Sequence, residues 1–89
     1  MQPNALLTEL VGRLAYLKKI CTAVLELYER TGAKHDRVRT SEVSAAVCGK
    51  VRRENSPAFR ADVIQAMKAV EWPCVKTGGV RQWKGVRRR

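Results

Sequence analysis

The residues of this chain best suited to chemistry are its lysines and arginines. The 89 residues include 18 Lys and Arg against 8 Asp and Glu, which gives a net charge of +10 and a pI of about 10.3. Residues 34–89 hold 14 of the cations and five of the acids, so the charge is concentrated in the C-terminal part. Cations at this density favour a polyanionic partner, nucleic acid first and an anionic membrane surface second.

Other chemistry has weaker support. His35, Cys21, Cys48 and Cys74 are residue types that bind zinc, but they are far apart in sequence and form no Cys-x-x-Cys pair. This spacing argues against a metal site, and the single histidine has no evident nucleophile beside it, so we expect no metal, no catalysis and no cofactor. Unpaired, widely spaced cysteines favour a reducing compartment, and no segment is apolar enough to span a membrane, so we expect a cytoplasmic protein.

A helix predicted over residues 57–71 would position part of the charge. Ser56 suits an N-cap, and Pro57 suits the first helical position. One face is apolar and requires a core; its residues are Phe59, Val63, Ala66, Met67 and Val70. The remaining surface has small or donor-rich side chains that suit a DNA major groove; these are Arg60, Ala61, Gln65 and Lys68.

A basic β-hairpin is predicted after this helix, over residues 74–86. Gly78 and Gly79 permit the positive φ angles of a tight turn, and Gly85 would kink the second strand. Lys76, Arg81 and Lys84 are expected to contact phosphates, followed by a mobile basic tail of Arg87, Arg88 and Arg89. Trp72 and Trp83 are expected in the core, with stacking on unpaired bases as the alternative.

Residues 3–31 are predicted to be helical almost throughout and to end at Thr31 and Gly32, either as one long helix or with a break near Gly12 or around Lys18 and Lys19. Its surplus apolar residues favour two alternatives, a homodimer interface or a hairpin folded back onto the core; they are Leu6, Leu7, Leu10, Val11 and Leu14. A short strand at Arg37–Arg39 is predicted next, and then a helix capped by Thr40 or Ser41 that ends at Gly49. Arg52 and Arg53 lie in the following connection, where they would contact phosphates beside Arg37 and Arg39.

The predicted order is helix, strand, two helices and a hairpin, which is that of a winged helix-turn-helix. The stretches Gln65–Trp72 and Gly79–Arg87 resemble the C-terminal winged-helix domain of phage and plasmid primase-helicases, although Glu71 stands where that pattern has glycine. We therefore predict an α+β fold, mainly α with a small β-hairpin. Its parts are an N-terminal helical segment over 1–33, the winged helix-turn-helix over 34–86 and a basic tail over 87–89.

The hypothesis from sequence is a double-stranded DNA-binding protein of phage or mobile-element type, either a regulator or a replication-origin-binding protein. Residues 57–71 would enter the major groove, and the hairpin would contact the backbone. If six to eight cations neutralise phosphates, the slope of log K against log salt is expected to be about −5 to −7. The alternatives are a structured-RNA-binding module and a small inhibitor or adaptor that occupies the nucleic-acid channel of a host enzyme.

Overall fold

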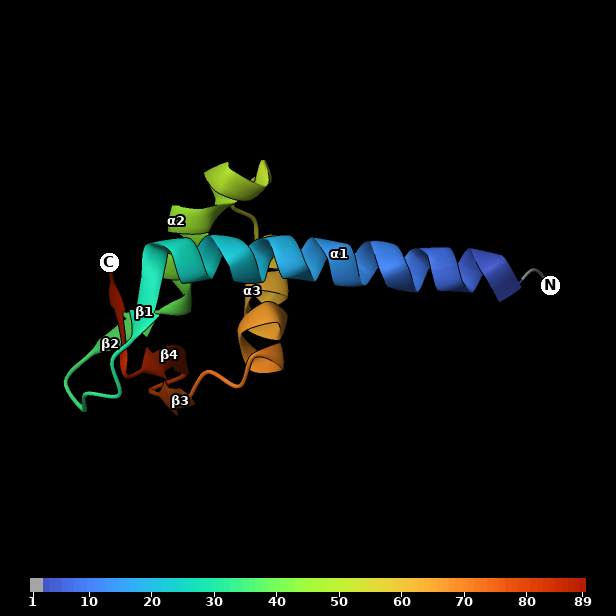
Figure 1. Ribbon diagram of the computed structural model, residues 1–89. Coiled ribbons are helices and arrows are strands. Elements are labelled where there is room, and N and C mark those ends of the chain that lie inside the picture. The colour runs from blue at the N-terminus through green and yellow to red at the C-terminus, as the bar shows by residue number, and fades with distance from the viewer. Residues whose placement is uncertain (1–2) are drawn as a thin grey trace.

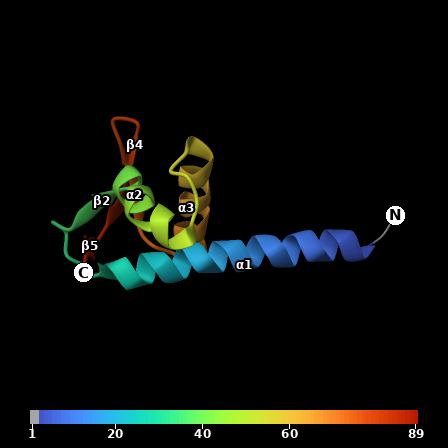
Figure 2. The same cartoon turned by 90° about the horizontal axis from the view of Figure 1, so that it is seen from above.

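The chain folds into a small α+β body from which one long helix projects. The computed structural model describes residues 3–89, with side chains from residue 7 onward. Three helices and five short strands occupy this range, and the molecule measures 50 × 23 × 22 Å (Figure 1, Figure 2). The coarse fold class predicted from the sequence is therefore confirmed. We call residues 3–15 the arm and residues 16–89 the body.

Helix α1 (Pro3–Leu27) belongs to both regions. Its 25 residues span about 37 Å at 1.5 Å per residue, more than the body can cover. Every arm side chain from Leu7 to Ala15 is exposed, whereas Ile20, Ala23 and Val24 are buried in the body. The predicted fold-back of the first half as a hairpin is therefore wrong, because α1 continues as one helix (Figure 2).

Helix α1 also ends earlier than predicted, at Leu27 instead of Thr31. The next residues form strand β1 (Tyr28–Arg30), which pairs antiparallel with β5 (Val86–Arg88). The N–H groups of Thr31 and Gly32 then both donate to the carbonyl oxygen of Gly85, at 2.6 and 3.2 Å. Pairing with the C-terminal strand therefore replaces the last predicted turn of helix.

The predicted strand before the second helix is confirmed as β2 (Arg37–Arg39), but the bounds of α2 (Thr40–Val51) differ. Arg39 occupies the N-cap position without a side-chain cap. The hydroxyl of Thr40 instead accepts a hydrogen bond of 3.0 Å from the indole N–H of Trp83 in the core. The helix continues past Gly49 and ends with Arg52 in the left-handed region at φ 58°.

Helix α3 (Pro57–Ala69) begins as predicted and ends two residues early. The Ser56 hydroxyl accepts a hydrogen bond of 3.1 Å from the N–H of Phe59, which confirms the cap. At the C-terminus Glu71 has φ 58°, and the N–H groups of Glu71 and Trp72 donate to the carbonyls of Lys68 and Met67. This bonding pattern is the Schellman motif, which favours glycine at the position that Glu71 occupies.

The hairpin prediction is confirmed by β3 (Cys74–Thr77) and β4 (Val80–Lys84), which pair across a turn where Gly78 and Gly79 have positive φ. Strand β4 also pairs with β2, so the sheet order is β2-β4-β3. Gly85 has φ 64° and turns the chain from β4 into β5, as its expected kink requires. Trp83 is fully buried in β4, and Trp72 and Val86 are also buried, so both tryptophans belong to the core.

Candidate nucleic-acid interface

Helix α3 presents a basic face on the side opposite its core residues. Phe59, Val63, Ala66 and Met67 are buried, and the helical period places Arg60, Ala61, Ile64 and Lys68 on the other side. Ala61 and Lys68 are exposed, and Arg60 and Ile64 are partly exposed. This side of α3 therefore offers a small residue between two cations, as close approach to a groove requires.

Gln65 lies at the edge of this face and is turned toward the arm. Its side-chain oxygen accepts a hydrogen bond of 2.5 Å from Arg13, whose same nitrogen lies 2.8 Å from a carboxylate oxygen of Asp62. The phenol of Tyr16 donates to the other Asp62 oxygen at 3.0 Å. Of the four α3 residues predicted to read DNA, the structure thus groups Arg60, Ala61 and Lys68, and it gives Gln65 a partner within the chain.

The cations of the hairpin fall on two opposite faces of the sheet. Lys76 and Arg81 are paired across β3 and β4 on the face that carries Trp83, and the Arg81 guanidinium donates to the sulfur of Cys74 at 3.2 Å. On the opposite face Arg37 is directly across from Lys84, with Arg39 two residues further along β2. Like charges opposite each other are destabilising unless an anion lies between them. Each face of the sheet therefore has two or three cations that would be stabilised by a phosphate.

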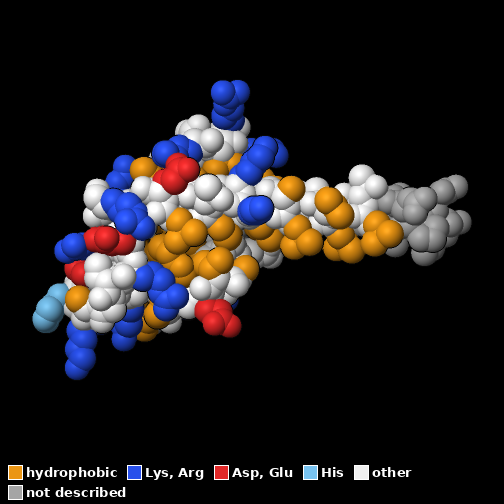
Figure 3. Space-filling view, in the orientation of Figure 1, with side chains coloured by type: hydrophobic (Ala, Val, Ile, Leu, Met, Phe, Trp, Pro, Cys, Tyr) orange, Lys and Arg blue, Asp and Glu red, His pale blue; other side chains and the backbone are white. Residues whose placement is uncertain are grey.

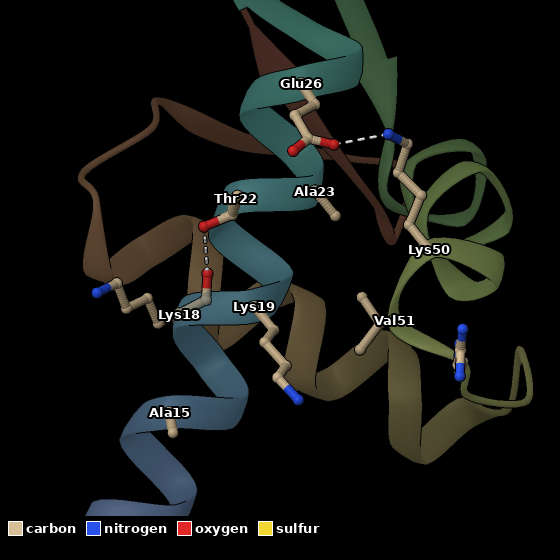
Figure 4. A pocket seen from close by; sticks show the side chains of 9 residues that line it. Ala15, Lys18, Lys19, Thr22, Ala23, Glu26, Lys50 and Val51 are labelled. Carbon is tan, nitrogen blue, oxygen red and sulfur yellow. Dashed lines mark hydrogen bonds and ion pairs between the residues drawn. The ribbon is translucent and has the colours of Figure 1, made fainter.

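Arg52 and Arg53 follow α2 and diverge. The Arg53 guanidinium lies over the ring of Tyr16, 4.8 Å from its centroid, so it contacts α1. Arg52 lines an open groove of about 630 Å³ between α1 and the end of α2 (Figure 4). The other cations of this groove are Lys18, Lys19 and Lys50, and Lys50 is paired with Glu26 at 2.6 Å.

The C-terminal arginines are ordered, so the predicted mobile tail is wrong. Arg87 pairs with Glu29 at 2.7 Å, and Arg88 lies over the ring of Tyr28 at 5.4 Å. The Arg89 guanidinium donates to the carbonyl oxygens of Leu25 and Tyr28 at 2.8 and 3.1 Å. Because β1 and the end of α1 supply these partners, the three arginines are less available to an external anion than cations without such contacts.

The groove beside α1 was missed by the sequence analysis. Lys18 and Lys19 are adjacent in sequence, but only the packing of α1 on α2 brings them beside Lys50 and Arg52 (Figure 4). Among the described residues, no group of three or more His, Cys, Asp and Glu side chains is placed to hold a metal ion. No helix in the same range is long and apolar enough to cross a membrane.

Comparison with protein-family models, curated proteins and solved structures finds no match to this chain. The resemblance to the primase-helicase winged-helix domain therefore stays a prediction, carried by the residues Gln65–Trp72 and Gly79–Arg87 alone.

Proposed function

We propose that this chain is a double-stranded DNA-binding protein with a winged helix-turn-helix fold. In this proposal α2 and α3 form the helix-turn-helix, α3 enters the major groove, and the β3–β4 hairpin is the wing. The element order and the sheet order β2-β4-β3 support this assignment. Its use as a regulator or origin-binding protein of phage or mobile-element type rests on the sequence resemblance.

One observation carries the proposal. The outward side of α3 and the hairpin carry Arg60, Lys68, Lys76 and Arg81, which are four of the 14 Lys and Arg residues that make no ion pair with any described residue. The chain's own pairs involve Arg13, Lys50, Arg87 and Arg89. Cations left without acids are those that a polyanion can neutralise at the lowest cost in broken contacts.

The proposed DNA contacts are of two kinds, those to base edges and those to phosphates. The guanidinium of Arg60 can donate two hydrogen bonds to the edge of a guanine, and Ala61 leaves room for the backbone to approach. Lys76 and Arg81 are assigned to phosphates beside the groove, and Arg39, directly before α2, to the backbone on its other side. With about five phosphates neutralised, we expect a slope of log K against log salt of about −4 to −5, at or below the lower end of the range expected from sequence.

The test is a fluorescence-anisotropy titration of duplex DNA across a salt series. The variant Lys76→Ala/Arg81→Ala is compared with Lys18→Ala/Lys19→Ala, which removes the same charge from the groove beside α1. We expect the hairpin variant to lose affinity about tenfold or more and to flatten the salt slope by about two, since two phosphate contacts are lost. The control is expected to stay within about threefold, because it changes only long-range attraction.

Equal losses in the two variants would contradict the proposed interface, since binding would then follow total charge. Competition with duplex RNA and with single strands separates the alternatives. RNA that displaces the DNA at lower concentration would indicate an RNA-binding module. Absent or salt-insensitive binding would favour the inhibitor or adaptor hypothesis, in which the basic surface contacts a protein.

A further inference from the structure

The arm carries an apolar stripe that the body does not cover. Leu7, Leu10, Val11 and Leu14 are 58–65% exposed, although each is a large aliphatic side chain. Hydrophobic side chains follow one edge of the arm and continue onto the body below α1 (Figure 3). Isolated exposed leucines are common, but four within eight residues on a projecting helix are a contiguous patch that favours a partner.

The spacing of the stripe indicates a helical partner. Alternating steps of three and four connect the apolar positions of α1, which are Leu7, Leu10, Leu14, Leu17, Cys21 and Val24, and the spacing continues to Tyr28 at the start of β1. This is the heptad spacing of a helix that packs along another helix. At the C-terminal end the chain supplies the cover itself, because Val24 and Tyr28 are buried and Cys21 donates to the Ala66 carbonyl of α3 at 3.3 Å. The N-terminal part of the same apolar stripe, at Leu7, Leu10 and Leu14, is exposed to solvent.

The charges favour a second copy of the chain as the partner. Residues 1–15 contain one acid and one cation, Glu9 and Arg13, while the other 17 Lys and Arg residues lie in residues 16–89. A neutral, leucine-lined arm does not attract the polyanion that suits the body. It does suit an identical neutral arm, because pairing two copies brings no net charge together. We infer that the chain forms a homodimer through an antiparallel pairing of its two arms.

The antiparallel direction follows from what lies along the stripe. A parallel pair would place the two strongly positive bodies side by side, with both α3 helices at the same point along the paired helices. In the antiparallel pair Leu7 packs beside the partner's Leu17 and Leu10 beside the partner's Leu14, and the two bodies lie at opposite ends.

This dimer stands apart from the proposed DNA binding, and its test uses no DNA. The oligomeric state of the full chain is measured by analytical ultracentrifugation from about 1 to 200 µM, since an interface this small suits a micromolar dissociation constant. The variant Leu14→Asp is compared with Ala15→Asp, which adds the same charge to the neighbouring, also exposed residue away from the stripe. Both changes lie outside the core, so both variants keep the folded body.

We expect the native chain and Ala15→Asp to reach a dimer and Leu14→Asp to stay monomeric throughout, a shift of at least tenfold in the dissociation constant. Small-angle X-ray scattering then gives the direction. Arms that overlap from Leu7 to Leu17 lengthen the 50 Å chain to a dimer of about 75 Å, whereas parallel arms leave it near 50 Å. A monomer at all concentrations, equal behaviour of the two variants, or a dimer near 50 Å would each overturn the inference.

Discussion

The arm and the body differ in where they place their apolar side chains and in how much charge they carry. In the body most of the large apolar side chains are enclosed, with Trp83, Val63 and Val86 fully buried, and the surface holds almost all of the charge. In the arm Leu7, Leu10 and Leu14 are exposed, and one cation balances one acid. A body stabilised by its own core can bind a polyanion, whereas a helix that exposes its apolar side is completed only by another apolar surface.

The comparison predicts that stability resides in the body. Trp83→Ala removes the largest fully buried side chain and leaves the Thr40 hydroxyl without its 3.0 Å donor. We expect a loss of about 3–5 kcal/mol in the free energy of unfolding, which a chain of this size barely tolerates. Leu14→Ala in the arm is expected to cost less than about 0.5 kcal/mol in the monomer. Denaturant unfolding at low protein concentration measures both; similar costs would mean that the arm is also packed in the monomer.

Glycine-to-alanine substitution is expected to change the free energy of unfolding in opposite directions in the body and in the arm. At Gly85 a Cβ would lie 2.9 Å from the Gly32 Cα, on a backbone with φ 64°, so Gly85→Ala is expected to cost about 2–4 kcal/mol. At Gly12 a Cβ meets nothing within 4 Å, and Gly12→Ala is expected to stabilise the helical arm by about 0.5–1 kcal/mol. Unfolding curves and helical circular dichroism test the pair, and a stabilising Gly85→Ala would refute the close β1–β5 junction.

A substitution at the C-terminal end of α3 is expected to have a smaller effect on the stability of the body. Glu71 has φ 58° at the glycine position of a Schellman motif, so Glu71→Gly is expected to stabilise the fold by about 0.5–1 kcal/mol. The control Lys68→Gly places the same residue inside the helix, where it is expected to destabilise by about 1 kcal/mol. Thermal unfolding separates the two, and equal signs would mean that α3 does not end as described.

The sequence predicted the elements whose signals are local. The Ser56 cap, the Pro57 start and the Gly78-Gly79 turn act within a few residues, and all three are confirmed. Strands β1 and β5 were missed because Tyr28 pairs with Arg88, 60 residues away, while the helical spacing of α1 continues through Tyr28. The ordered tail was missed for the same reason.

In the candidate site, too, some features follow from local sequence patterns and others depend on tertiary packing. The grouping of Arg60 with Lys68 follows from the helical period, and the opposite faces of Lys76 and Lys84 follow from strand alternation. The contact of Gln65 with Arg13 and the groove of Lys18 with Arg52 depend on how helices from distant parts of the sequence pack. No local pattern carries that information.

Tyr16 lies at the junction where the arm leaves the body. Burial raises the pKa of Tyr16, and the hydrogen bond to Asp62 raises it further, while Arg53 and Arg13 act in the opposite direction. Asp62→Asn is therefore expected to lower this pKa, because the carboxylate no longer opposes the phenolate, and Arg13→Ala is expected to raise it. Absorbance titration of the phenolate measures both shifts, with Tyr16→Phe identifying the signal.

The ionisation of Tyr16 makes the stability of the folded chain depend on pH. Since the pKa of Tyr16 is higher in the folded chain than in the unfolded chain, its contribution to stability is present below the unfolded value, near 10, and is lost as the pH rises through the folded value. The contribution is small because Tyr16 and its partners are partly exposed, so we expect Arg13→Ala to change the free energy of unfolding at neutral pH by less than about 1 kcal/mol. If Asp62→Asn and Arg13→Ala shift the pKa of Tyr16 in the same direction, Tyr16 responds to a general loss of packing at the junction. Opposite shifts would show that one carboxylate holds the arm, through Arg13 and Tyr16, against α3.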